Sequence, residues 1–433
     1  MTFRPAALAL TGWALGALAC GSRSGLLGVE RDAGPEAGAL GGASSGGASF
    51  GGTAGTAPCL ALSKTPVVLT PDDVPVPPRD DNLRLTASSE DGEQVTAAFL
   101  RSGSGDSYSV RHATLRPWGA WPSGTGGLAP LGPLHSAQIS TVSSHRVARS
   151  KGETWAVVTR AGGGPALARF LPTSVDGNAG DSIALSGIEP MFVAENASVS
   201  AHLVGAFDTQ GSGSLLRITI VDSDGGVKDL PALGCANGQP LRADAVAFDE
   251  GWLVASRAAP AWVSAPDRRH RHRRSSTSYA ASSGQLTVLS SFTTGATVLD
   301  VAAARSKLGI FVVWSTAVTA PGQTPEILAE RVSGADGGSL GPVSIASGEF
   351  GSFAVGSIGS DLVVARRLGL GALAFRLLDE GLGPVADLAF EVGPNLGPSS
   401  VYGSPNGRGA VVGFTSLVDG GFRVRLARID CAP

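Results

Sequence analysis

The feature that most constrains the fold of this chain is a sequence pattern that repeats along it. Each copy has a short apolar run, a turn, and a strand that carries an arginine. The clearest copy reads Phe311-Val312-Val313-Trp314, followed by a strand with Arg331. Short β-branched runs separated by Gly, Asp, Asn and Pro are typical of strands and turns, and we find no long amphipathic helix. We therefore predict an all-β chain. The copies begin near Val95, Trp155, Leu203, Leu253, Phe311, Leu362 and Val411.

The copies recur about every 50 residues, a period typical of propeller blades. Over residues 59–433 the sequence thus resembles a seven-bladed β-propeller. The resemblance is to an architecture and not to a functional family. The Trp-Asp signature of WD40 repeats is not found, kelch glycines are out of register, and the sialidase Asp box is incomplete at Gly152–Trp155. A propeller hosts many activities, so function must be argued from a site.

The two ends of the repeat region predict how the ring closes. The last copy ends at Cys431 without an outer strand, whereas a spare strand, Pro66–Leu69, precedes the first copy. If the N-terminal strand completes the last blade, Cys59 comes beside Cys431, and we predict a disulfide between them in an oxidising compartment. We expect Cys235 to be a buried free thiol, because no histidine lies near it in sequence.

The N-terminus carries a targeting signal. Residues 1–19 combine Arg4 with an apolar stretch that is too short to span a bilayer. The stretch ends in Ala17-Leu18-Ala19-Cys20-Gly21, which resembles a bacterial lipobox with Ala in place of the usual Leu. The resemblance implies that Cys20 is a lipid attachment site and that the protein is sorted to the outer membrane. An ordinary signal peptide, giving a secreted or periplasmic protein, is the alternative. Residues 20–58 are rich in Gly, Ala and Ser and predict a flexible linker.

The strongest local concentration of charge is the run from Arg268 to Arg274. It holds the arginines Arg268, Arg269, Arg271, Arg273 and Arg274 and two histidines, His270 and His272, that add charge below about pH 6.5. We expect a solvated loop insertion, since so many like charges repel one another. The run fits a polyanion such as acidic polysaccharide, lipopolysaccharide phosphate or DNA. A merely polar loop is the alternative.

Four more arginines follow the central strands of their copies: Arg101, Arg160, Arg257 and Arg366. Because the same end of a blade strand reaches the same face in every blade, we predict that they ring the axial channel and bind an anion. A slip of one residue would reverse their side chains, so scattered surface arginines are the alternative. We expect the arginines of the adjoining strand, such as Arg331 and Arg376, to be structural.

The sequence excludes more activities than it indicates. The net charge is −3, cysteines and histidines lack metal-site spacing, and no phosphate loop, dinucleotide fingerprint or Ser-His-Asp order is present. We expect no cofactor, no metal and no sequence-specific nucleic acid. The sequence favours a monomeric, non-enzymatic binding or scaffold module for a protein or glycan, with membrane contact through the lipid only. The alternative is a polysaccharide-active hydrolase or lyase, for which two carboxylates, or an acid and a histidine, must converge.

Overall fold

The computed structural model describes the chain in 21 segments between residues 59 and 431. They are residues 59–62, 66–68, 76, 83–87, 92–102, 108–119, 135–139, 146–150, 153–159, 165–170, 182–210, 213–235, 242–248, 251–258, 272–280, 285–294, 297–317, 324–333, 338–339, 341–348 and 352–431. These residues belong to one compact unit, Gly52–Pro433. Within them, no helix is long and apolar enough to cross a membrane.

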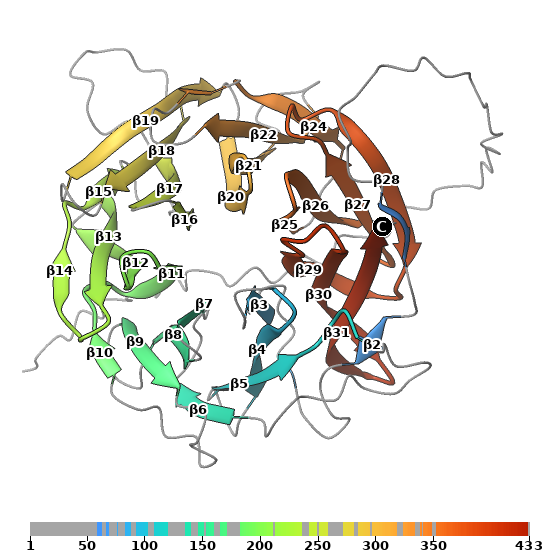
Figure 1. The fold of residues 1–433 in the computed structure, drawn as a ribbon, viewed down its shortest axis with the longest axis horizontal. Helices are drawn as coiled ribbons and strands as arrows, with labels where there is room; N and C mark the ends of the chain where they lie inside the picture. The colour runs from blue at the N-terminus through green and yellow to red at the C-terminus, as the bar shows by residue number, and fades with distance from the viewer. Residues whose placement is uncertain are drawn as a thin grey trace, which may run out of the picture. The chain divides into compact units, whose positions relative to one another are not determined.

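The described strands form seven separate antiparallel sheets, which we number in chain order (Figure 1). Sheets 1 and 2 contain β3 (Leu83–Ala87), β4 (Val95–Ser102), β5 (Tyr108–Leu115) and β6 (His135–Ile139), and then β7 (Arg146–Ser150), β8 (Glu153–Thr159), β9 (Pro165–Phe170) and β10 (Ser182–Ala184). Sheet 3 contains β11 (Glu189–Asn196), β12 (Ala201–Gln210), β13 (Gly213–Asp222), β14 (Val227–Asp229) and β15 (Leu233–Cys235).

The following three sheets repeat this order. Sheet 4 contains β16 (Ala243–Phe248), β17 (Gly251–Ala258), β18 (His272–Ala280) and β19 (Gln285–Thr294). Sheet 5 contains β20 (Thr297–Ser306), β21 (Gly309–Ala317), β22 (Glu326–Ser333), β23 (Gly338–Ser339) and β24 (Val343–Ser347). Sheet 6 contains β25 (Phe353–Ile358), β26 (Asp361–Leu368), β27 (Ala372–Leu378) and β28 (Pro384–Glu391).

Sheet 7 is built from both ends of the described chain. It contains β29 (Asn395–Gly403), β30 (Gly409–Val418) and β31 (Gly421–Cys431), and its outer edge is formed by β1 (Cys59–Leu62) and β2 (Val67–Val68), which both pair with β31. The sequence predicted one closing strand at Pro66–Leu69. The structure instead divides this task between two short strands, and β1 lies earlier than predicted.

The first strands of the sheets contact one another in a closed cycle, in the order β3, β7, β11, β16, β20, β25, β29 and β3 again. The central strands predicted from the sequence are β4, β8, β12, β17, β21, β26 and β30, the second strand of every sheet. Their apolar residues are buried because each sheet packs on a neighbour through both of its faces.

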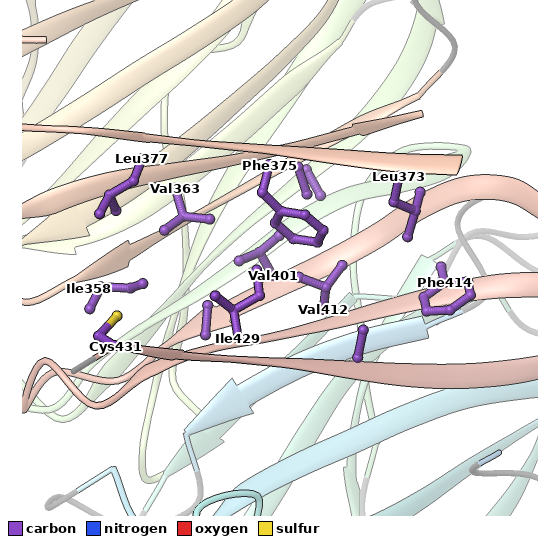
Figure 2. Packing of buried hydrophobic residues seen from close by; sticks show 14 of the residues in the cluster. Ile358, Val363, Leu373, Phe375, Leu377, Val401, Val412, Phe414, Ile429 and Cys431 are labelled. Carbon is purple, nitrogen blue, oxygen red and sulfur yellow. The ribbon is translucent and has the colours of Figure 1, made fainter. Parts of the chain in front are cut away.

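The hydrophobic core is therefore a series of layers between neighbouring sheets. The layer between sheets 6 and 7 contains Phe375, Val363, Val401 and Ile429 (Figure 2). In that layer the ring of Phe375 also stacks on Phe390 at a centroid distance of 5.2 Å. Other layers lie between sheets 2 and 3, 3 and 4, 4 and 5, 5 and 6, and 7 and 1. This alternation of sheet and core explains why apolar runs recur so regularly.

Candidate functional site

The order of strands divides the connections into two sets. In every sheet the second strand turns into the third at the end where the first strand begins, because consecutive strands are antiparallel. We call this side of the ring the entry face. The turns between first and second strands lie on the opposite face.

Large apolar side chains are exposed on the entry face. Leu370 (75% exposed) and Leu368 (42%) occupy the turn between β26 and β27, and Leu417 (43%) lies at the end of β30. Two hydrogen bonds join these turns through the link between sheets 6 and 7: Asn395 N donates to Leu370 O (3.1 Å), and Leu417 N donates to Pro394 O (2.9 Å). We call Leu368, Leu370 and Leu417 the apolar rim.

Two more exposed residues lie at the entry-face ends of first strands. Ile188 precedes β11, and Leu299 stands at a bulge in β20 between Val298 and Asp300. On the opposite face, Leu308 is exposed in a turn, and Val227 and Val385 are exposed at the starts of the fourth strands β14 and β28. Five of these exposed residues therefore lie on the entry face and three on the opposite face. A group of neighbouring exposed apolar side chains indicates contact with another surface, whereas scattered single ones are normal.

The four predicted anion-binding arginines share one end of their strands but do not line the axis. Arg101, Arg257 and Arg366 lie near the entry-face ends of β4, β17 and β26, whereas Arg160 lies outside the described residues. Because these are second strands, the first strand of each sheet stands between them and the centre. The predicted axial ring is therefore not supported by the topology, and anion binding by these residues stays a prediction.

Among these second-strand arginines, Arg366 is the one whose surroundings are described. It occupies the same sheet face as Leu362 and Val364, which pack in the layer between sheets 5 and 6. Partial burial lowers the pKa of Arg366, and the neighbouring guanidinium of Arg376 lowers it further. Arg366 thus belongs to the contact between two sheets.

The basic run is only partly a loop. Arg268, Arg269 and Arg271 lie outside the described residues, but β18 begins at His272, so that Arg273 and Arg274 are strand residues. The sequence interpretation missed β18 because its polar composition, rich in Ser and Arg, hides a strand. In the register of sheet 4, Arg274 is directly opposite Arg257, and Arg273 is opposite Ala258. Two separate predictions therefore meet at one end of sheet 4, on the entry face.

The arginines of the third strands are structural, as predicted. Arg331 donates to Leu308 O (2.9 Å) of its own sheet and to Glu380 O (3.1 Å) of sheet 6. Arg376 forms a bidentate ion pair with Asp387 (2.6 and 2.7 Å) and donates to Ile345 O of sheet 5. The hydrogen bonds with Asp387 raise the pKa of Arg376. These side chains tie neighbouring sheets together through main-chain carbonyl groups.

Arginines of β31 likewise connect sheet 7 to main-chain carbonyl groups of neighbouring segments. Arg425 donates to Val392 O (2.8 Å) and to Pro66 O (3.3 Å), next to β2, and its guanidinium lies 5.7 Å from the centre of the Phe414 ring. Burial lowers the pKa of Arg425. Arg428 donates to Pro117 O (2.9 Å) and Gly119 O (3.0 Å) of sheet 1.

The described carboxylates near turns make local or structural contacts. Asp208 pairs with Arg217 at 3.0 Å, and Asp300 accepts from Val301 N at 3.1 Å. Asp244 accepts from its neighbour Ala245 N and from Ala303 N of sheet 5, both at 2.9 Å, so that it joins two first strands. No group of three His, Cys, Asp or Glu residues that could hold a metal occurs in the described part of the chain. These contacts give no support to a hydrolytic carboxylate pair.

Trp118, which follows β5, contributes to the packing of the fold. Trp118 packs against the layer between sheets 7 and 1, and its Nε1 donates to Gly92 O (3.0 Å). Trp121 lies outside the described residues. Trp118 is thus a packing residue at the junction of sheets 7 and 1.

The cysteines fall in three different environments. Cys431 is held in a disulfide, and the residue opposite it in the pairing of β1 with β31 is Cys59. Cys235 ends β15, opposite Ser214. Cys20 lies outside the described residues.

A small apolar cavity lies between sheets 6 and 7. Its volume is about 20 Å³, and it is lined by Ile358, Val363, Phe375, Ile429 and other apolar side chains, with Arg376 at its edge. A cavity of this size holds at most about one water molecule. It is a packing void and not a ligand site.

The burial of one histidine was not predicted from the sequence. His202 stands within the apolar run Ala201–Val204 and is 2% exposed in the structure. Its ring lies 4.9 Å from the Trp155 ring of sheet 2, centre to centre. Burial lowers the pKa of His202 to about 4. Only the placement of sheets 2 and 3 reveals this contact.

Comparison with solved structures identifies the fold. The WD40 domain of coronin from Toxoplasma gondii is similar with a TM-score of 0.53 and 10% identity, over 87% of this chain and 90% of that one. Hydrazine synthase of Kuenenia stuttgartiensis gives a TM-score of 0.49 at 14% identity, over 82% and 96% of the two chains. No known protein family and no curated protein matches the sequence.

The closed cycle of first strands, the layered core and the likeness to the coronin domain together define a β-propeller. The predicted all-β propeller architecture is confirmed. Identity near 10% establishes a shared fold and carries no activity across.

Proposed function

We propose that this chain is a lipid-anchored, non-enzymatic binding module of the cell envelope, and that it binds a protein partner through the entry face of a seven-bladed propeller. Each of the seven sheets counts as one blade in this proposal, which the cyclic contacts of the first strands support. The observation that carries the function is the apolar rim, Leu368, Leu370 and Leu417, on two turns joined through Pro394 and Asn395.

The direction in which the chain enters the propeller supports this use of the entry face. Cys59 begins β1 beside Cys431, at the end of β31 that lies on the opposite face. The first described residue, Cys59, therefore lies on the face opposite the apolar rim. We propose that Cys20 is the lipidated residue, that the protein is an outer-membrane lipoprotein, and that the tether leaves the entry face accessible.

Two variants test the lipid anchor. Cys20→Ala should abolish incorporation of labelled palmitate and release the protein from the membrane fraction, whereas Cys235→Ala should leave both unchanged. Continued labelling of Cys20→Ala would contradict the anchor. It would leave the ordinary signal peptide, with a secreted or periplasmic protein, as the explanation.

Site-specific crosslinking tests the entry face. A photoreactive phenylalanine analogue is placed at Leu370 or, as a matched control, at Leu308, which is 50% exposed on the opposite face. We expect an adduct of defined mass from position 370 that Leu417→Asp suppresses, and none from position 308. Equal adducts from both positions, or adducts insensitive to Leu417→Asp, would contradict the proposal.

A second candidate ligand is a polyanion, such as an acidic glycan, at the arginine end of sheet 4. The register that places Arg257 opposite Arg274 favours it, because like charges directly opposite each other destabilise a sheet unless an anion screens them. Retention on immobilised heparin should fall with salt and disappear when residues 268–274 are replaced by Gly and Ser. Arg116→Ser, an exposed arginine of sheet 1, should be retained like the parent protein. Equal flow-through of all three proteins would exclude the polyanion.

A polysaccharide-active hydrolase or lyase remains the alternative function. The described carboxylates do not favour it, since Asp208, Asp244 and Asp300 are committed to structural contacts. Release of reducing ends from acidic polysaccharides, lost in variants of single carboxylates, would establish this alternative.

A further inference from the structure

The contact between sheets 2 and 3 contains a buried histidine. His202 of β12 lies against Trp155, with the two ring planes at 45°. Around them the layer consists of Val157, Leu167, Val204 and Val221. The imidazole is therefore enclosed by apolar groups from both sheets.

The imidazole lacks the hydrogen bonds that usually accompany burial. Neither Nδ1 nor Nε2 of His202 has a hydrogen-bond partner among the described residues. A neutral ring tolerates such a site at some cost, but an imidazolium has two donors and a full charge to satisfy. Burial accordingly keeps the pKa of His202 near 4, against an ordinary value of 6.5.

Sheet 3 has charged groups on the same face as His202, with which a protonated imidazole would interact. Glu195 of β11 is directly opposite His202 in the register. On this face Asp208 also pairs with Arg217, and Asp229 accepts a hydrogen bond from Thr219.

The facing strands of sheet 2 add charge of both signs. At register positions on the face of Trp155, sheet 2 places Arg169 opposite Trp155, Arg146 opposite Val157, and Glu153 two residues before Trp155. None of these positions places a carboxylate as a defined partner for an imidazolium at His202. An imidazolium must therefore turn towards Glu195 or reach water.

We infer that the contact between sheets 2 and 3 is an acid-sensitive joint in which a proton on His202 breaks the packing against Trp155. The proton comes from solvent and binds one ring nitrogen. The charged ring leaves the apolar layer, and the two sheets separate locally while the remaining layers stay closed. The inference is independent of the partner proposed for the entry face.

The direction of the effect follows from the difference between the two pKa values. Above pH 6.5 the ring is neutral in both the closed and the open joint, so the proton has no influence. As the pH falls from 6.5 to about 4, only the open form binds the proton, and opening becomes more favourable by up to tenfold per pH unit. The full change is about 300-fold, and it levels off below pH 4.

Hydrogen–deuterium exchange of the full protein tests the joint. Protection of β8 and β12 is followed from pH 7.5 to 4.0, corrected for intrinsic exchange and compared with β26 and β30. We expect selective loss of protection in these strands that His202→Leu removes and that His135→Leu, a histidine of another sheet, retains. The same pH profile in His202→Leu as in the parent protein would overturn the inference.

If His202→Leu does not fold, a titration of the parent protein tests the inference instead. The NMR signal of His202, assigned by its loss in His202→Gln or by its contact with Trp155, should remain neutral to about pH 4 while exchange in β12 rises. Titration of this signal near pH 6.5 with unchanged protection would overturn the inference equally.

Discussion

Arg84 in the first strand of sheet 1 donates from Nη1 to the carbonyl oxygen of Ser399 in sheet 7, at 2.7 Å. The next residue along, Leu85, donates its main-chain N–H to the Ser400 hydroxyl at 3.1 Å. These two contacts join the first sheet to the last, and they lie close to the centre of the ring because β3 and β29 are both first strands. They supplement the strand pairing at the outer edge of sheet 7.

Replacing Arg84 by Met should weaken this junction. The change keeps the length of the side chain but leaves the half-buried carbonyl of Ser399 without its donor, so we expect the free energy of unfolding to fall by about 1–3 kcal/mol. Chemical denaturation measures it, with Arg116→Met as the control at an exposed arginine. An equal effect of the two substitutions would show that Arg84 has no special role in closure.

Two ion pairs differ in what they add to the fold. Arg376 pairs with Asp387 and also donates to the main-chain carbonyl of Ile345 in the neighbouring sheet, whereas Arg408 pairs with Glu93 at 2.8 Å and both of these side chains are exposed. Arg376→Met should therefore cost about 1–3 kcal/mol and Arg408→Met no more than about 1 kcal/mol. Raising the salt concentration should reduce the difference little, since the carbonyl contact is partly buried. Identical denaturation midpoints for the two variants would refute this ranking.

Gly403 marks a close approach between sheets 6 and 7. A Cβ atom on Gly403 would lie 1.8 Å from the carbonyl oxygen of Ser357, which is main chain and cannot move aside alone. Gly403→Ala should destabilise the protein by about 1–3 kcal/mol through displacement of the two sheets. Gly119→Ala, where the nearest atom is 3.6 Å away, is the control and should change thermal unfolding little. An unchanged melting temperature for Gly403→Ala would show that the sheets separate freely.

We propose that Cys59 is the disulfide partner of Cys431, since strand pairing places the two residues opposite each other. The double variant Cys59→Ser and Cys431→Ser should lose about 5 kcal/mol of stability in the chain-entropy model, because the bond closes a very long loop. Peptide mapping without reductant should recover one crosslinked pair of peptides. A pair that contains Cys235 instead would disprove the assignment.

The second strands and most third strands could be predicted from the sequence, whereas most first strands and several outer strands could not. The runs beginning near Leu203, Phe311 and Val411 are apolar at successive positions, because both faces of a second strand are buried between neighbouring sheets. An outer strand such as β14 is short and exposed, so its composition does not differ from that of a loop. β18, a third strand of nine residues, was missed because its composition is polar.

The candidate site was less accessible to sequence reasoning because it depends on which strand is innermost. The arginines at positions 101, 257 and 366 were correctly placed at one end of their strands, but the sequence does not reveal that a further strand separates them from the axis. The pairing of Arg257 with Arg274 and the contact of His202 with Trp155 each need residues from strands far apart in the chain. The apolar rim was overlooked because single leucines in turns have no recognisable pattern.

The pairing of β1 with β31 has a consequence for how the protein is made. β1 is synthesised before every other strand of the propeller, yet the hydrogen bonds that it forms are with the strand synthesised after all of them. Pairing across so many residues makes folding slow, because most of the chain must be ordered before the contact repays its entropy. Until β31 emerges, sheet 7 has no outer edge, and the faces of the two sheets beside the gap are exposed. The emergence of β31 from the ribosome or from an export channel therefore sets the moment at which the ring becomes resistant to proteases and aggregation.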